Sequence, residues 1–159
     1  MSQQPPEEKG TEEHSPKKQQ NPLFSEILSP HPLPQKLANI RIFLSSGSDP
    51  NELDNLSRHQ IGRPLHYALS TDAGYDNLKR NLPIIKLLLE AGADPRLRGE
   101  GVKGFPTFGQ SALDEVKALM GDGNVNGGGE DFKGLKEFYE GAWKEMKRVA
   151  DGLDGMWFS

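Results

Sequence analysis

The stretch LPIIKLLLEAGADPR, residues 82–96, repeats the pattern of an earlier stretch, LANIRIFLSSGSDPN, residues 37–51. In both, aliphatic residues at helical spacing are followed by a glycine and then by Asp-Pro. Apolar residues at this spacing predict a helix, and a glycine just after them is typical of a helix end in the left-handed conformation. A fixed offset between two such segments predicts an array of stacked units. The corresponding positions differ by 45 throughout, pairing Leu37 with Leu82, Ile40 with Ile85, Leu44 with Leu89, Gly47 with Gly92 and Asp49 with Asp94.

A shorter helix is expected before the second copy. The segment GRPLHYAL, residues 62–69, has a proline suited to a first helical turn, where its missing N–H costs nothing. Leu65, Ala68 and Leu69 form an apolar stripe at helical spacing. Asn81, just before the next helix, is of a residue type that caps helix starts. Each unit alone would leave an apolar face uncovered, and stacking would cover it.

These two segments resemble the ankyrin repeat. GRPLHYAL is similar to the family's Thr-Pro-Leu-His-x-Ala signature, and IIKLLLEAGADP, residues 84–95, is similar to its second helix and exit. The family's period is about 33 residues. Counted from Arg63, which stands at the Thr position of the signature, this period would place the exit aspartate at position 86. It stands at Asp94, so we place an excess of eight residues near DAGYDNLK, residues 72–79. The resemblance implies an all-α fold, a short ankyrin-repeat solenoid of helix–turn–helix units with finger loops.

The rest of the chain divides around this unit. Residues 1–22 contain a single aliphatic or aromatic residue, Met1. We expect a disordered tail here, because the segment cannot bury enough apolar surface to offset the entropy of ordering. We assign residues 23–150 to the ankyrin-repeat domain, with about one full repeat at 52–96 between atypical capping units, and residues 151–159 to a C-terminal tail.

Each capping unit keeps part of the pattern. The first has a degenerate first helix, LFSEIL, residues 23–28. The third unit starts at GQSALDEVKAL, residues 109–119, and its second helix begins at about Asp131, after a glycine-rich insertion at 121–129. This last helix carries an apolar stripe through residues 131–157. We interpret it as a cap that closes the stack, with a partner-binding amphipathic helix as the alternative.

His66 could be a catalytic base or a structural residue. The resemblance implies a structural role, in which the signature's His and Thr hydrogen-bond near the turn. Arg63 stands at the Thr position, so half of that interaction should be missing, and restoring Thr should stabilise the turn. A catalytic His66 would need a nucleophile or an orienting carboxylate, and the sequence offers no such motif. We assign structural roles to seven positions: Pro64, Leu65, His66, Ala68, Leu88, Gly92 and Asp94.

Other signs of catalysis or cofactor binding are weak. The chain has no cysteine, and the remaining histidines, His14, His31 and His59, do not form the i, i+4 pair of a zinc-binding helix. GEGVKG, residues 99–104, has the spacing of a dinucleotide-binding loop but lacks the strand required before it, and Pro106 opposes a helix after it. We therefore expect no enzyme, no metal and no cofactor.

Charge indicates the class of partner. The net charge of −4 is too mild to favour nucleic acid or a membrane, yet segments 54–63 and 96–103 carry net charges of +1 and +2. Ankyrin proteins bind through finger loops and first-helix faces, so the resemblance implies non-catalytic binding of another protein, and the basic face suits an acidic peptide. We predict that the partner is bound by Arg58, His59, Ile61, Arg63 and Tyr67 in the full repeat, and by Arg96, Arg98, Lys103, Phe105 and Phe108 in the next finger.

We also expect a monomer, located in the cytoplasm or the nucleus. The lack of cysteine fits a reducing compartment, and the N-terminal residues contain no apolar secretory segment.

A different class of function stays open, a regulatory protein controlled by calcium or phosphorylation. DGNVNGGGEDFK, residues 122–133, matches four positions of an EF-hand loop, but Lys133 stands where a bidentate Glu is needed. SPKK, residues 15–18, resembles a proline-directed phosphorylation site at Ser15. Either the loop or the tail would then change its charge state.

Overall fold

The computed structural model describes residues 21–54, 62–70, 74–99, 110–120 and 134–156. Over these residues the chain is helical apart from its turns, and extended backbone pairs at one isolated antiparallel bridge, between Arg98 and Ser111. The predicted all-α class is therefore confirmed for this part of the chain. The helices are α2 (Pro22–Ile27), α3 (Leu33–Ser45), α4 (Pro64–Ala68), α5 (Tyr75–Lys79), α6 (Leu82–Glu90), α7 (Ala112–Met120) and α9 (Leu135–Met156).

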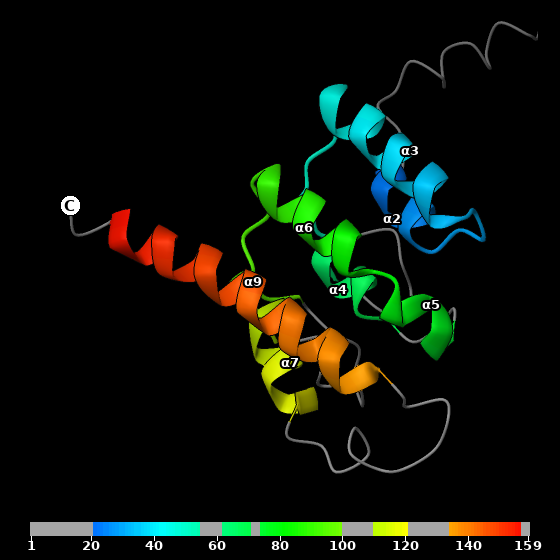
Figure 1. Ribbon diagram of the computed structural model, residues 1–159. Coiled ribbons are helices and arrows are strands. Elements are labelled where there is room, and N and C mark those ends of the chain that lie inside the picture. The colour runs from blue at the N-terminus through cyan, green and yellow to red at the C-terminus, as the bar shows by residue number, and fades with distance from the viewer. Residues whose placement is uncertain (1–20, 55–61, 71–73, 100–109, 121–133, 157–159) are drawn as a thin grey trace, which may run out of the picture.

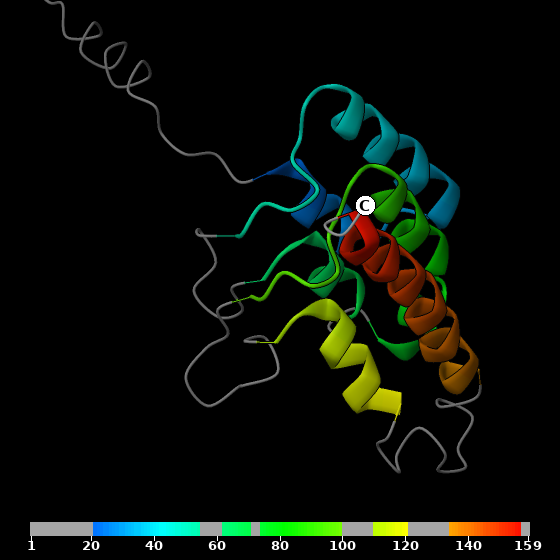
Figure 2. The same ribbon diagram turned by 90° about the vertical axis from the view of Figure 1, so that its left-hand side faces the viewer.

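The helices form two layers. Figure 1 shows α3, α6 and α9 side by side, and Figure 2 shows α2, α4 and α7 in a second layer beside them. Helices pack in pairs across the layers, with α2 on α3, α4 on α6 and α7 on α9. Neighbouring pairs touch through α2 and α4, through α3 and α6, and through α6 and α9. The described chain therefore builds three helix pairs that stack in sequence order.

The 45-residue offset of the sequence is repeated in the backbone at the ends of α3 and α6. Gly47 and Gly92 both have a φ of 104°, a left-handed conformation that glycine adopts without steric cost. The residue after each glycine donates to the carbonyl five residues back, at 3.0 Å in the first exit and 2.9 Å in the second. Asp49 and Asp94 then each accept from the backbone N–H two residues on, at 2.8 Å and 2.9 Å. The two helix exits are thus the same structure, built twice.

The apolar stripes of the helices meet between the layers. Ile40 of α3, Ile85 and Leu88 of α6, and Met146 of α9 are all fully buried. The stripe on α9 is buried along residues 135–150, and this helix packs on both α6 and α7. Since the stripe is already covered by the chain itself, these contacts favour the cap over the partner-binding helix.

The first helix begins earlier than the sequence indicated. Asn21 caps α2, because its Oδ1 accepts from Leu23 N–H at 3.0 Å. Its Nδ2 also donates to Asp49 O at 3.0 Å, which ties the start of α2 to the exit of α3. Residues 21 and 22 therefore belong to the folded chain and not to the tail assigned to 1–22.

The last helix is also placed differently. It begins at Leu135, after the left-handed Gly134, and not near Asp131. It continues to Met156, so the boundary that we placed at residue 150 cuts through a helix. No proline interrupts this segment, and a helix can therefore continue past its last buried residue.

Part of the excess between α4 and α6 forms the short helix α5, which packs on α9. Asn81 follows it and stands at the N-cap position of α6, but the expected side-chain cap is absent there. Its Nδ2 instead donates to Ala68 O at 3.0 Å and ties the start of α6 to the end of α4. None of the helices described here is both long enough and apolar enough to cross a membrane.

Candidate functional site

The connections between successive helix pairs emerge at one end of the pairs. They join the end of α3 to the start of α4 and the end of α6 to the start of α7. We call their described residues the connection edge: 46–54, 62–63, 91–99 and 110–111. In sequence, the residues predicted to bind a partner fall within these connections or next to them.

His66 of α4 hydrogen-bonds toward the next unit. The residue is 1% exposed. Its Nδ1 accepts from Arg63 N–H at 2.9 Å, and its Nε2 lies 2.7 Å from Gln110 O. Since Nδ1 is the acceptor, Nε2 carries the proton and donates to that carbonyl. Burial lowers the pKa of His66, with the positive charge of Arg63 adding to the effect and the Gln110 carbonyl opposing it. The neutral imidazole therefore joins the second helix pair to the third.

Arg63 holds both connections together. Its Nη1 donates to Asn51 O at 2.7 Å, and its Nε donates to Arg98 O at 2.9 Å. The local side-chain cap that a threonine would provide is absent, as expected. The guanidinium instead makes two contacts to other segments, which the sequence did not indicate. The same contacts occupy the side chain that we predicted to meet a partner.

Asn51 makes a further link, which we did not predict from the sequence. Its Oδ1 accepts from Asp94 N–H at 2.7 Å, and its Nδ2 donates to Gly92 O at 3.0 Å. The exit of α3 is thereby bonded to the exit of α6. An amide that both donates and accepts, placed two residues after a turn aspartate, was the available signal.

Arg96 is also engaged within the chain. Its Nε and Nη2 donate to the Asp94 carboxylate, each at 3.0 Å, and its Nη1 pairs with Asp154 on α9. The hydrogen bond from the guanidinium lowers the pKa of Asp94. The predicted binding residue therefore connects the exit of α6 to the C-terminal part of α9, and its side chain stays only 32% exposed.

Tyr67 is not a surface contact, and its assignment to partner binding is wrong. The residue is 6% exposed, and its hydroxyl donates to Asp54 Oδ2 at 2.6 Å. Its ring centroid lies 4.8 Å from that of Phe24. The short helix α4 is covered by α2, so the aromatic face that would meet a partner already packs against the first pair.

Arg98 is exposed at the connection edge.

Several other predicted sites fall outside the described residues, namely the calcium-type loop at 122–133 and the phosphorylation site at Ser15. The same holds for six of the predicted binding residues: Arg58, His59, Ile61, Lys103, Phe105 and Phe108.

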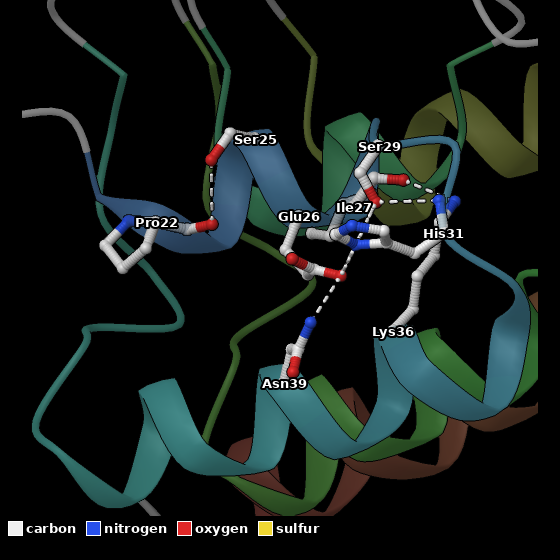
Figure 3. Close-up of polar contacts among 8 residues, drawn as sticks. All are labelled: Pro22, Ser25, Glu26, Ile27, Ser29, His31, Lys36 and Asn39. Carbon is white, nitrogen blue, oxygen red and sulfur yellow. Dashed lines mark hydrogen bonds and ion pairs between the residues drawn. The ribbon is translucent and has the colours of Figure 1, made fainter.

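A second polar cluster lies at the other end of the first helix pair. Figure 3 shows the buried Glu26 carboxylate between the His31 ring and the Asn39 amide. Its Oε2 is 2.8 Å from His31 Nδ1 and accepts from Asn39 Nδ2 at 3.1 Å. Ser29 Oγ lies 3.2 Å from the same Nδ1. In a Ser-His-acid hydrolase the serine and the acid use different ring nitrogens, so this cluster ties α2 to α3 and lacks that catalytic geometry.

Within the described ranges, no three His, Asp or Glu side chains are grouped so that they could hold a metal ion. The features that distinguish the molecule are thus its repeated helix exits and the bonds between its connections. In comparisons with known proteins, no family model matches the chain, and no curated protein or solved structure matches it significantly.

Proposed function

We propose that this chain is a short ankyrin-type repeat protein that binds another protein, without catalysis, through the connection edge and its adjoining segments. The observation that carries the proposal is the hydrogen bonding along this edge, where His66, Arg63 and Asn51 each join one helix pair to the next. Such bonds hold the two connections against each other. A preorganised edge lets several segments meet one partner with little further loss of conformational entropy.

The residues proposed to contact the partner are fewer than the sequence indicated. Arg63 and Arg96 are used for contacts within the chain, and Tyr67 is buried. The remaining residues combine positive charge with apolar and aromatic side chains, which suits an acidic peptide segment. They are Arg58, His59, Ile61, Arg98, Lys103, Phe105 and Phe108.

Selection from a displayed library of random peptides, with the full chain as bait, tests this function. We expect the enriched peptides to be rich in Asp and Glu. The affinity of one such peptide is then measured by fluorescence polarisation at low salt. The double variant Arg58→Glu with Lys103→Glu should weaken binding by tenfold or more, because it places like charges opposite the peptide.

The matched control is Lys86→Glu with Lys144→Glu. Both lysines are exposed, on α6 and α9, and lie off the connection edge. This variant changes the net charge by the same amount and should bind as the wild type does. Equal weakening in both double variants would show a non-specific charge effect, and a library without enriched peptides would contradict the proposal altogether.

A further inference from the structure

A polar cavity of about 110 Å³ lies between the first and second helix pairs, at the end opposite the connection edge. Its walls come from the loop before α3 and from the residues around the junction of α5 and α6. One water molecule needs only roughly 10–15 Å³ of such space. The cavity is therefore large enough for a small polyatomic ion or for the charged end of a larger molecule.

Lys36, a buried cationic residue, forms part of the wall of this cavity. The residue is 5% exposed, and its Nζ donates to Ile27 O at 3.0 Å, a contact drawn in Figure 3. That carbonyl is neutral, and none of the ion pairs formed among the described residues involves Lys36. Buried charges in proteins are normally paired, but among the residues that the structure describes this ammonium bonds to a neutral carbonyl and to no counter-charge.

Glu26 does not fill that role. Its negative charge raises the pKa of Lys36, but its Oε2 already lies within hydrogen-bond distance of His31 Nδ1 and Asn39 Nδ2. The Glu26 carboxylate and the Lys36 ammonium form no ion pair. Burial is the stronger influence and lowers the pKa of Lys36. An anion inside the cavity would favour the charged amine.

Other groups around the cavity add positive potential. Arg80, an exposed residue, lines the cavity with a second cationic side chain. The His31 ring, whose Nδ1 contacts the Glu26 carboxylate, forms another part of the wall. Leu33 and Asn81 also form part of the wall, and these are the first residue of α3 and the N-cap of α6. Neither helix start has a side-chain cap, so the positive ends of two helix dipoles add to the charges of Lys36 and Arg80.

We propose that this cavity binds a small oxyanion, a phosphate or a carboxylate group, as the counter-charge of Lys36 and Arg80. The site is independent of the proposed partner surface, because it lies at the opposite end of the helix pairs. The two can therefore be tested separately.

The probe is inorganic phosphate, added to the full ¹⁵N-labelled chain at constant ionic strength, with acetate in a parallel titration. Binding is followed through the amide signals of Leu33, Arg80 and Asn81. We expect saturable shifts with a dissociation constant on the order of 1 mM, since the ligand is small. Saturation by phosphate alone, by acetate alone or by both supports an oxyanion site and identifies the preferred chemistry.

Two variants and a control make the test specific. Lys36→Met keeps the length of the side chain without its charge, and Arg80→Gln removes an exposed charge whose loss should not affect folding. Each should weaken binding at least tenfold, whereas Lys86→Met, on the exposed side of α6, should leave it unchanged. Should Lys36→Met fail to fold, as judged by circular dichroism, Arg80→Gln decides the matter.

The proposal is overturned if neither anion gives saturable shifts, or if the folded cavity variants bind as tightly as the wild type. The connection-edge variant Arg58→Glu with Lys103→Glu should retain anion binding. A loss of peptide binding in that variant would thus be separable from a loss at the cavity.

Discussion

Arg63 serves two carbonyl oxygens that belong to different connections, those of Asn51 and Arg98. A guanidinium presents its five N–H donors in a rigid plane, so it can bond in two directions at once. A threonine hydroxyl at this position could serve only its own turn. Arginine therefore exchanges a local contact for two contacts that hold neighbouring units together.

Replacing Arg63 with Thr should lower the free energy of unfolding by about 1 kcal/mol. Two hydrogen bonds of about 1 kcal/mol each are lost, and one helix cap of similar value is regained. This reverses the expectation drawn from the sequence. Urea denaturation measures the change. Arg63→Lys keeps the charge without the planar donors and should lose a similar amount, and a Thr variant at least as stable as the wild type would contradict this account.

Glu115 of α7 is a buried acid with an unusual titration. The residue is 7% exposed, and its Oε1 has no hydrogen-bond partner within the part of the chain that the structure describes. Burial raises its pKa to about 8, whereas the unfolded chain would release the proton near pH 4.3. The folded state thus binds more protons between these values. The contribution of the protonated Glu115 to stability is therefore complete below about pH 4.3 and is lost as the pH rises toward 8, because deprotonation is easier in the unfolded chain.

Glu115→Gln should remove this pH dependence, because glutamine keeps the shape of the protonated acid and does not titrate. We expect similar stability of variant and wild type at pH 4.3, and a variant more stable by on the order of 3 kcal/mol at pH 7. Urea denaturation at a series of pH values measures both. Glu90→Gln, at an exposed site on α6, is the control and should follow the wild type. Parallel curves for Glu115→Gln and the wild type would rule out the shifted titration.

At the scale of the element, the ends of α3 and α6 are built around a left-handed glycine. The space around Gly47 and Gly92 is open, since an added Cβ would meet nothing within 4 Å. The requirement for glycine is therefore a matter of backbone conformation, with φ at 104° in both, and not of crowding. This explains why the same residue recurs at both exits.

Gly92→Ala should destabilise the protein by about 1–2 kcal/mol, the cost of a Cβ in the left-handed region. Gly152→Ala is the matched change inside α9, where the site is equally open and φ is not positive. It should stabilise by up to about 1 kcal/mol, because alanine is the better helix former. Thermal unfolding should move in opposite directions for the two variants, and equal shifts would refute the conformational argument.

At the scale of the whole molecule, α6 is the central helix. It packs on α4 within its own pair, on α3 of the pair before and on α9 of the pair after. In a stack of few units, stability comes from the interfaces between nearest neighbours. Damage to α6 therefore affects both neighbouring interfaces at once.

Leu88→Ala should cost about 2–5 kcal/mol, because Leu88 is fully buried on α6 and its truncation leaves a cavity. That is a large share of the 5–15 kcal/mol typical of a domain. Ile42→Ala removes an aliphatic side chain that is 59% exposed on α3 and should change stability by less than about 0.5 kcal/mol. Denaturant unfolding compares the two, and a small loss at Leu88 would show that α6 does not hold the stack together.

Much of the helical framework could be predicted from the sequence. A helix bonds residues four apart and shows its buried face at a regular spacing, so the signal for each helix lies within its own segment. The copies at 37–51 and 82–96 also contained the glycine and Asp-Pro of each exit, and both exits have the same backbone geometry. The start of α2 was harder to predict, because it depends on a contact of Asn21 with the next exit. The end of α9 was harder to predict because the helix continues past its last buried residue, Ala150.

The connections were decided by the tertiary structure. His66 reaches a carbonyl 44 positions away, and Arg63 reaches one 35 positions away. The amino-acid sequence alone was equally compatible with an Arg63 that faces a partner and with a Tyr67 that lies at the surface. Which occurs depends on the atoms that the neighbouring helix pair brings within hydrogen-bonding reach, and on whether α2 covers α4. Local periodicity contains no information on either, because both depend on how separate units stack in space.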